Sequence, residues 1–376
     1  MSRIYLDSAS VAPLRSAAKE AVLAGLNLPT ADPGRLHTEA MEVRAHLEHA
    51  REQVAVLLGA RPSEIIFNSS ASEGIATVVK GMLSTSPDGV VVGTAVEHSA
   101  VRLSAGDSFV PVPVTGEGLV TVDALRQTLA DQTRVGRPIV LLALQLGNHE
   151  MGAVQPIANL LNVARDVRIA TLVDAAQAAP WRTIDVRSLE PNYLTISGPK
   201  LGAPLGTGAL MVQRGQRTAP FIMGGAQERG RRAGLENVPA AMGLGAACDE
   251  LAESIQREID HVSALTLMLR DGLADLDGVT LFGPEAPEHR LPHLVCCGLD
   301  RIEPQAVLID LDRAGIAAHS GSACASEELE PSPVLAAMGV DADRSLRFSL
   351  HRHSTMADVQ RVLDVLPGSL ARLRAL

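Results

Sequence analysis

The sequence predicts an α/β protein with a mainly parallel sheet covered by helices on both faces. Between about residues 60 and 215, short continuous apolar runs alternate with segments of helical periodicity. Continuous apolar strands between helices are typical of parallel sheets whose two faces are both buried. Apolar residues make up 46% of the chain and aromatic residues only 2%, so the expected core is aliphatic.

The expected strands of this sheet are the short apolar runs at residues 64–68, 90–93, 109–113, 139–144, 169–173, 193–197 and 208–212. Helical patterns fill the intervals at 72–83, 122–130 and 157–165. Ligands of such sheets bind beyond the carboxyl ends of the strands. Asp174 and the turn that leads to Lys200 both follow a strand, which places them at that edge.

A long helix from residue 237 to about 273 is expected to lead into a second, smaller α+β unit. Strands near 279–281 and 293–297 and helices near 304–314 and 356–373 would form it. We expect a large α/β domain of residues 12–255 and a small domain built from residues 1–11 and 256–376.

Composition excludes several classes of function. A formal net charge of −10 argues against a nucleic-acid-binding surface. No apolar run approaches the roughly 18 residues expected of a membrane span, and the first residues show no signal-peptide pattern. The four cysteines fit no metal site and no disulfide framework. We therefore expect a cytoplasmic protein without a metal.

Lys200 is a candidate amine nucleophile. The chain has three lysines against thirty arginines, and Lys200 ends the run Tyr193-Leu-Thr-Ile-Ser-Gly-Pro-Lys200. Arginine can replace lysine as a surface charge but not as a nucleophile, because a guanidinium stays protonated. This placement suggests the Schiff-base lysine of pyridoxal 5'-phosphate (PLP); an ordinary surface lysine is the alternative.

Four further residues meet the physical needs of a PLP site. The carboxylate of Asp174 would keep the pyridine nitrogen protonated. Ser72 lies where a strand runs into a helix, and this helix start would hold the phosphate. His98 could stack on the ring, and Gln177 could donate to the phenolic oxygen. A strand-end cap, a capping box and a structural histidine are the ordinary alternatives, but together these placements favour PLP.

Cys324 is the second chemical feature. It lies in His319-Ser-Gly-Ser-Ala-Cys-Ala-Ser326, a Gly/Ser-rich run without apolar period that is typical of an exposed loop. Cysteines are usually buried, so this one is a candidate reactive thiol; a small residue in a turn is the alternative. Cys248, Cys296 and Cys297 fall in helix or strand patterns and are expected to pack in the core.

Taken together, these runs resemble the cysteine desulfurases of the class V aminotransferase family over almost the whole chain. The most specific segments are 197–200, 224–230, 232–238 and 320–326. The last of these resembles the subgroup with a long cysteine loop. The resemblance implies the PLP-dependent transferase type I fold and a homodimer.

The resemblance also implies a reaction. L-cysteine would displace Lys200 from PLP, and Lys200 would then act as general base and acid. Cys324 would take the substrate sulfur as a persulfide, release L-alanine and pass the sulfur to an acceptor protein, an iron–sulfur scaffold or a sulfur carrier. His98 would help to deprotonate the substrate thiol. Arg347 would hold the substrate carboxylate; a strand-end ion pair is its structural alternative.

By the same resemblance Ala71 and Ser197 contact the cofactor, and Asn148 contacts the substrate. The chain departs from the family pattern at three positions. His149 replaces an asparagine that contacts cofactor or substrate, Pro199 replaces a phosphate-contacting histidine, and Leu235 replaces a threonine that reaches the partner's phosphate. Because two phosphate hydrogen bonds are lost, we expect looser PLP binding.

Two other functions stay open at this point. One is another PLP enzyme of the same fold, a C–S lyase or selenocysteine lyase, in which Cys324 is dispensable. The other is a catalytically silent scaffold, which the departures from the family pattern at His149, Pro199 and Leu235 would favour.

Overall fold

The computed structural model describes residues 3–320 and 331–375. Its main sheet has seven strands in the order β2 (Ile65–Asn68), β8 (Gly208–Val212), β7 (Tyr193–Ser197), β6 (Thr171–Asp174), β5 (Ile139–Gln145), β3 (Val90–Thr94) and β4 (Phe109–Val112). Strand β8 is antiparallel to both of its neighbours and the other pairs are parallel. The predicted mainly parallel sheet is confirmed, and each predicted strand is found within two residues of its expected bounds.

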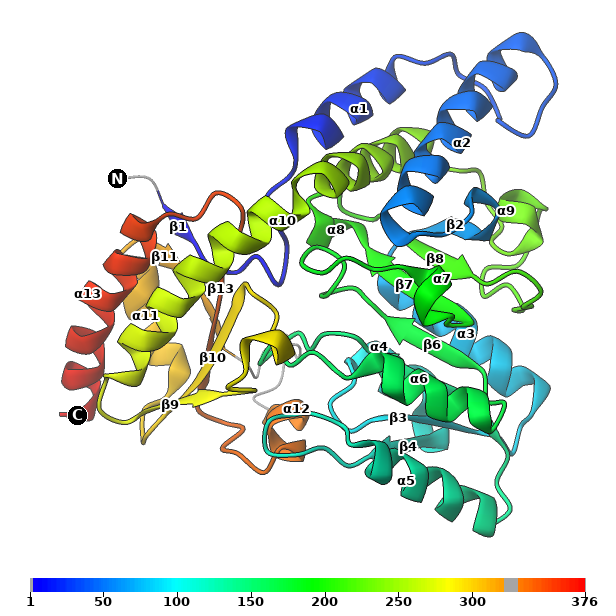
Figure 1. Ribbon diagram of the computed structural model, residues 1–376. Helices are drawn as coiled ribbons and strands as arrows, with labels where there is room; N and C mark the ends of the chain where they lie inside the picture. Colours follow the sequence, from blue (N-terminus) through cyan, green and yellow to red (C-terminus); the bar gives the residue numbers. More distant parts are fainter. Residues whose placement is uncertain (1–2, 321–330, 376) are drawn as a thin grey trace.

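Helices cover both faces of this sheet (Figure 1). They are α3 (Ala71–Thr85), α4 (Ser99–Ala105), α5 (Val122–Arg134), α6 (Ile157–Asp166) and α7 (Val186–Leu189). Alternate residues of each strand enter different clusters: Val91 packs with α3 and α4, while Val90 and Val92 pack on the face that α5 and α6 cover. Side chains of a strand alternate between its faces, so these buried runs need helices on both sides.

A helical layer lies beside the sheet and consists of α1 (Ser16–Leu26), α2 (Thr38–Leu58) and α10 (Val238–Ala274). Both α1 and α2 pack against α10, which crosses the molecule diagonally (Figure 1). Gly245 allows the close approach of α2, because a Cβ there would lie 2.8 Å from the Cα of Ala50. Short helical turns are α8 (Gly198–Leu201), α9 (Gln227–Gly230), Pro62–Glu64, Gly106–Ser108 and Pro287–His289.

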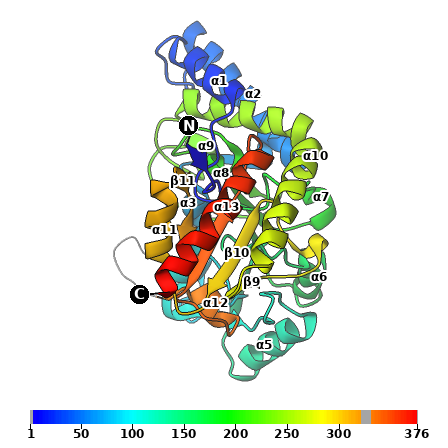
Figure 2. The same ribbon diagram turned by 90° about the vertical axis from the view of Figure 1, so that its left-hand side faces the viewer.

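The C-terminal part forms a second, antiparallel sheet in the order β12 (His319–Ser320), β13 (Ser345–Ser349), β10 (Leu294–Leu299) and β9 (Val279–Phe282). Beside it, β1 (Ile4–Tyr5) pairs in parallel with β11 (Ile316–Ala317). The helices here are α11 (Pro304–Arg313), α12 (Pro333–Ala337) and α13 (Met356–Arg374), and Figure 2 shows α13 lying across this sheet beside α10.

One hydrophobic cluster joins the two sheets, since it contains both Leu194 of β7 and Phe348 of β13. The boundary expected at residue 255 lies inside α10, which continues without interruption, so the domain division remains a prediction. In the parts of the chain that the structure describes, no helix is both long and apolar enough to span a membrane.

Candidate active site

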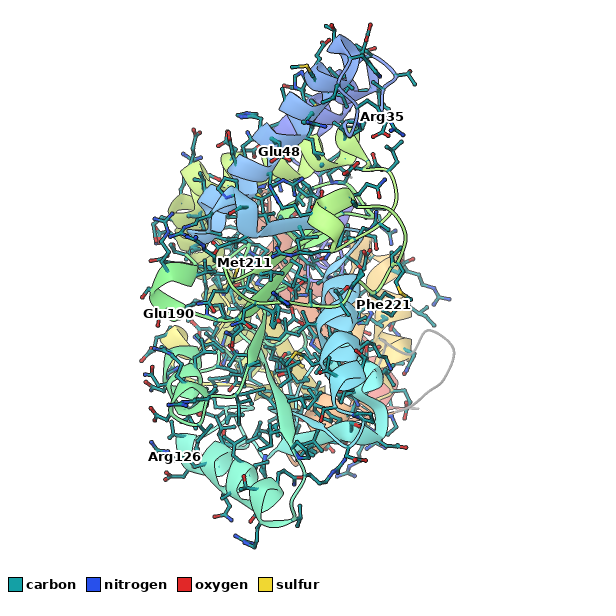
Figure 3. The ribbon with its side chains drawn as sticks, turned by 90° about the vertical axis from the view of Figure 1, so that its right-hand side faces the viewer. Arg35, Glu48, Arg126, Glu190, Met211 and Phe221 are labelled. Atoms are coloured by element: carbon teal, nitrogen blue, oxygen red, sulfur yellow. The ribbon has the colours of Figure 1, made fainter. Side chains whose placement is uncertain are left out.

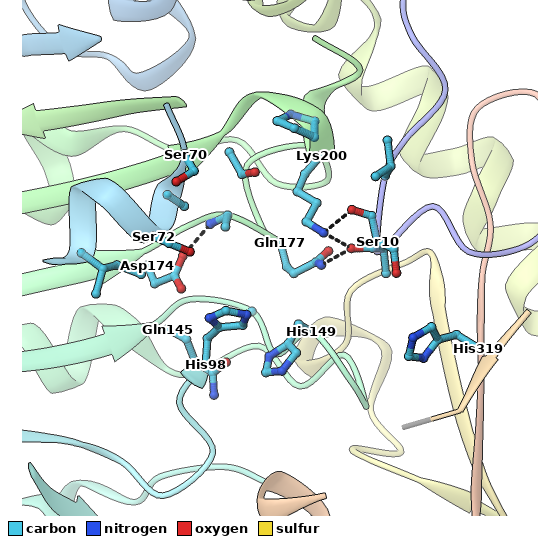
Figure 4. A pocket seen from close by; sticks show the side chains of 18 of the residues that line it. Ser10, Ser70, Ser72, His98, Gln145, His149, Asp174, Gln177, Lys200 and His319 are labelled. Atoms are coloured by element: carbon cyan, nitrogen blue, oxygen red, sulfur yellow. Dashed lines mark hydrogen bonds between the residues drawn. The ribbon is translucent and has the colours of Figure 1, made fainter. Parts of the chain in front are cut away.

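A cavity of about 350 Å³ opens where β5, β6 and β7 end (Figure 4). Most of the predicted site residues line it: Ala71, Ser72, His98, His149, Asp174, Gln177, Ser197, Lys200 and Arg347. These residues come from segments more than 270 positions apart, and the carboxyl edge of the sheet brings them together.

Lys200 lies in the short helix α8, directly after β7. Gly198 begins this helix, where a Cβ would lie 2.0 Å from the Oγ1 of Thr207, so a larger residue would displace the turn. The Lys200 ammonium donates to the carbonyl oxygens of Ala9 and Ser10 (Figure 4). The turn after β7 therefore places the Lys200 amine in the cavity, and the carbonyl groups of the N-terminal segment orient it.

Asp174 ends β6 and is buried at the floor of the cavity. Its Oδ1 accepts a hydrogen bond from the Ala176 N–H at 2.9 Å. Burial raises the pKa of this carboxyl, against the opposite effects of that hydrogen bond and of the charges of His149 and Lys200. A buried carboxylate in this position gains from a cationic N–H donor, which is what a protonated pyridine ring offers.

The residues expected to hold the phosphate lie at the N-terminus of α3. Ser70 caps the helix by accepting from the Glu73 N–H, and Glu73 accepts from the N–H of Ser69, the residue before the cap. The first N–H groups of a helix have no acceptor inside the helix. Those of Ala71 and Ser72, both lining residues, therefore suit a phosphate.

His98 is held as a neutral ring. Its Nδ1 accepts from the Ala100 N–H at 3.1 Å, so the neutral ring carries its proton on Nε2. Burial, followed by the charges of His149, Lys200 and Arg102, lowers the His98 pKa to about 3. A neutral ring suits stacking on a cofactor. The predicted deprotonation of the substrate thiol is less favoured, because a second ring proton would break the bond to Ala100.

His149 and Asn148 have different environments. The His149 ring meets the His98 ring edge-on at 4.9 Å, and its Nε2 lies 3.4 Å from Oε1 of Glu150. Asn148 is fully buried and does not line the cavity; its amide donates to the Val96 carbonyl and accepts from the N–H groups of Glu150 and Met151. The structure thus places His149 with the site, whereas Asn148 stabilises the turn that carries it.

Arg347 projects from β13 toward the cavity. It donates to the carbonyl oxygen of His149 at 2.9 Å, to Oδ1 of Asp7 at 2.8 Å and to Oγ of Ser10 at 2.9 Å. Its Nε is buried and has no hydrogen-bond partner among the described residues. The ion pair expected as the structural alternative is present, and the guanidinium keeps N–H groups, the Nε–H among them, without a partner among the described residues.

Sequence reasoning missed several residues of the site. Ser10, Gln145 and His319 line the cavity, and Glu97 is completely buried behind it. Burial raises the Glu97 pKa to about 8, although the Gln145 N–H and the Thr94 hydroxyl both donate to its Oε1 at 2.8 Å. The sequence signal that could have identified Glu97 is its position directly before His98, a predicted site residue.

Three of the four cysteines are described, and all three are buried. Burial raises the pKa of Cys248 and of Cys297 to about 12, and burial also raises the pKa of Cys296 well above its usual value. Cys324 and the predicted long cysteine loop lie outside the described residues. No group of metal-ligating side chains is found in the described parts of the chain.

Comparison with known proteins agrees with this geometry. The sequence model of the family described as Aminotransferase class-V matches residues 4–362. A cysteine desulfurase of Gluconacetobacter diazotrophicus is 37% identical, with 100% of this chain and 95% of the relative covered. The cysteine desulfurase NifS of Azotobacter vinelandii is 34% identical, with 100% and 94% covered.

Solved structures give the same result. A NifS-like protein from Rickettsia africae superimposes with a TM-score of 0.88 at 25% identity, over 100% of both chains. SspA in complex with cysteine gives a TM-score of 0.77 at 26% identity, over 94% of this chain and 100% of that one. The fold and site thus define a PLP-dependent enzyme. The chain belongs to the class V aminotransferase family, within the group of cysteine desulfurases.

Proposed function

We infer that the protein is a PLP-dependent cysteine desulfurase that converts L-cysteine to L-alanine and transfers the sulfur to its own Cys324. The observation that carries this is the cavity itself, which combines the Lys200 amine, the buried Asp174 carboxyl and the start of α3. When bound, PLP supplies an aldehyde for the substrate amine and a ring that accepts electrons as substrate bonds break.

The residues present fit this cofactor. Asp174 would hold the ring nitrogen, His98 would cover the ring face, and Gln177 would lie beside the phenolic oxygen. Ala71, Ser72 and Ser197 would contact the phosphate side of the cofactor. Gln177 now donates to the Ala9 carbonyl at 2.7 Å, so its amide is already held in the cavity.

Lys200 would take a proton from the substrate carbon and return one to it as general base and acid, because the N-terminal segment holds its amine in the cavity. Arg347 would bind the substrate carboxylate through its buried Nε–H and the neighbouring N–H groups. The Asp7 carboxylate competes for the same guanidinium and keeps it oriented before substrate arrives.

Cys324 is proposed as the sulfur acceptor because the other three thiols are unsuited to the task. A thiolate is the nucleophile, and buried thiols with strongly raised pKa values are not ionised at neutral pH. The Cys324 thiolate would attack the substrate sulfur. The bond from that sulfur to the substrate β-carbon breaks, and protonation of the remaining carbon skeleton gives alanine.

Four further features belong to the proposal. The enzyme acts as a homodimer. Two exposed apolar residues support this: Leu205 at the cavity mouth is 71% exposed, and Leu235 in the adjoining pocket is 60% exposed. Its persulfide is passed to an acceptor protein, an iron–sulfur scaffold or a sulfur carrier. A cytoplasmic location and PLP binding that is looser than usual stay predictions from the sequence.

A mass spectrum of the intact protein after brief exposure to L-cysteine tests this function. We expect one added sulfur atom on Cys324, and no such adduct on the other cysteines or in the Cys324→Ala variant. Cys324→Ala should also lose alanine formation while it keeps the visible absorbance of bound PLP. Unchanged turnover in that variant would instead indicate a lyase that does not use the thiol.

A further inference from the structure

A second cavity lies away from the Lys200 site, beside α10. It has a volume of about 480 Å³ and is enclosed by the middle of α10, the segment 181–183 after β6 and the segment 287–292 before β10. Figure 2 shows α10 running past the small sheet at this level. Three arginines line this cavity, Arg182, Arg270 and Arg290, and we call it the arginine cavity.

Arg270 is the most unusual of these residues. It is only 8% exposed, yet it forms no hydrogen bond from its side chain and no ion pair with any described residue. The other buried arginines of the described chain each bind a carboxylate. These pairs are Arg15 with Glu258, Arg51 with Glu228, and Arg347 with Asp7. The Arg270 guanidinium lines the cavity, and none of its nitrogen atoms is among those shielded from solvent without a partner. It is therefore open to a ligand in the cavity, and a cationic donor group without a bound carboxylate favours an anion there.

The neighbouring arginines bring further positive charge close to Arg270, and their own hydrogen bonds go to uncharged backbone carbonyls. Arg290 donates to the backbone carbonyls of Pro284 and Glu285 at 3.2 and 2.7 Å, and Arg182 donates to the Glu288 carbonyl at 3.4 Å. Burial, and then the charge of Arg290, lowers the Arg270 pKa, which shows that the two guanidinium groups repel each other.

Three carboxylates in this region partly offset that repulsion without binding the arginines directly. Asp271 and Glu285 act on Arg270 only at a distance, and Glu288 acts in the same way on Arg290. None of the three forms an ion pair with an arginine of the cavity within the described residues. The three arginines of the cavity therefore keep guanidinium N–H groups that no carboxylate of the described chain binds.

The rest of the lining suits an organic anion. Thr266 lies one helical turn before Arg270 on α10, and its hydroxyl is buried without a hydrogen-bond partner. Leu267, Leu291 and the indole of Trp181 provide apolar walls. Guanidinium groups bind phosphates and carboxylates through two parallel hydrogen bonds, and the volume is in the range of small-molecule sites.

We propose that the arginine cavity binds a small organic anion that carries a phosphate group or paired carboxylates. The anion forms ion pairs with Arg270 and Arg290 and accepts a hydrogen bond from the Thr266 hydroxyl. This site shares no lining residue with the Lys200 cavity, so it is independent of the chemistry proposed there.

Trp181 allows the binding to be observed directly. It is the only tryptophan of the chain, it lines the arginine cavity, and its ring stacks on His293 at 4.7 Å. Its fluorescence should therefore change when an anion enters. The PLP-loaded protein is titrated with inorganic phosphate, pyrophosphate or citrate at constant ionic strength, with sodium chloride as the reference.

We expect a saturable fluorescence change with at least one of these anions. At an anion concentration tenfold above the dissociation constant, Tm should rise by about 1–3 °C. Arg270→Met should abolish both responses without lowering Tm in chloride, because no partner of Arg270 is lost. Arg257→Met, on the exposed side of the same helix, should keep both responses.

The pattern of responses identifies the ligand chemistry, since phosphate alone indicates a phosphate ester and citrate alone a polycarboxylate. Should Arg270→Met not fold, Arg290→Met replaces it and should also abolish both anion responses; its Tm in chloride serves only as its own reference, because it loses the bonds to the Pro284 and Glu285 carbonyls. The proposal is wrong if none of the anions gives a saturable response, or if the arginine variants respond as the wild type does.

Discussion

At the scale of single residues, Glu97 is a carboxyl whose protonation is strongly changed by folding. It is fully buried beside the active site, and its carboxyl accepts from the Thr94 hydroxyl and the Gln145 N–H. Burial is the main cause that raises its pKa to about 8, and the nearby Asp174 charge adds to this. Glu97 is therefore mostly neutral at pH 7 and adds little negative charge behind Asp174.

The raised pKa has a defined effect on stability. Between the unfolded pKa near 4.5 and the folded pKa near 8, the folded state holds more protons than the unfolded state. Stability therefore falls as pH rises through this window, by at most about 1.4 kcal/mol per pH unit from this group. Glu97→Gln removes the titration, so this variant should gain stability relative to wild type from pH 5 to 8.

Denaturant unfolding of both proteins at pH 5, 6.5 and 8 measures this difference. Glu42→Gln, on an exposed position of α2, is the control and should show a difference that does not depend on pH. A constant difference for Glu97→Gln would mean that the buried carboxyl does not titrate in this range.

At the scale of structural elements, α9 shows how an ion pair holds a strained segment next to the site. Glu228 and Arg229 have φ values of 47° and 59°, a left-handed conformation that is unfavourable for residues with a side chain. The Glu228 carboxylate binds Arg51 of α2 at 2.7 Å and the Phe67 N–H of β2 at 2.9 Å. These bonds fix the segment that carries Arg232 and Leu235 against the start of α3.

Glu228→Gln should destabilise the protein by about 3 kcal/mol or more, because it leaves the Arg51 guanidinium buried without a full counter-charge. Glu48 also pairs with Arg51, at 3.1 Å, but its side chain is 43% exposed. Glu48→Gln should therefore change stability by less than about 1 kcal/mol. Urea unfolding at one protein concentration compares the two variants, and equal losses would contradict the importance of burial.

Local patterns explain how much the sequence predicts at this scale. The strands of the main sheet were predictable because each is a continuous apolar run, and Asp174 and Lys200 because each follows such a run. Helices α1 and α2 were not predicted, since they pack on α10 outside the strand–helix alternation. The contacts of Lys200 with Ala9 and Ser10 were not predictable either, because they join positions about 190 residues apart.

At the scale of the whole molecule, exposed apolar side chains indicate where a second copy would bind. Met223 is 83% exposed and Phe221 is 51% exposed, in the segment that follows β8. Figure 3 shows Phe221 at the edge of the molecule. This segment leads into α9 and Leu235, which borders the pocket at Ser69 next to the start of α3.

Met223→Glu should weaken the proposed homodimer at least tenfold, because it places an unpaired charge in the interface. Sedimentation velocity over a range of protein concentrations measures this change. Val135→Glu, at the end of α5 and 66% exposed, adds the same charge elsewhere and should leave association unchanged. A Met223→Glu protein that sediments like wild type would exclude this segment from the interface.

The pairing of the first residues with the last strands also bears on biosynthesis. Ile4 pairs with Ile316, and Asp7 bridges to Ser349 and binds Arg347. During translation the N-terminal segment therefore cannot adopt its folded position until these late residues have left the ribosome. The Lys200 amine gains its carbonyl partners only when that segment is in place, so we expect the site around Lys200 to be completed late in synthesis.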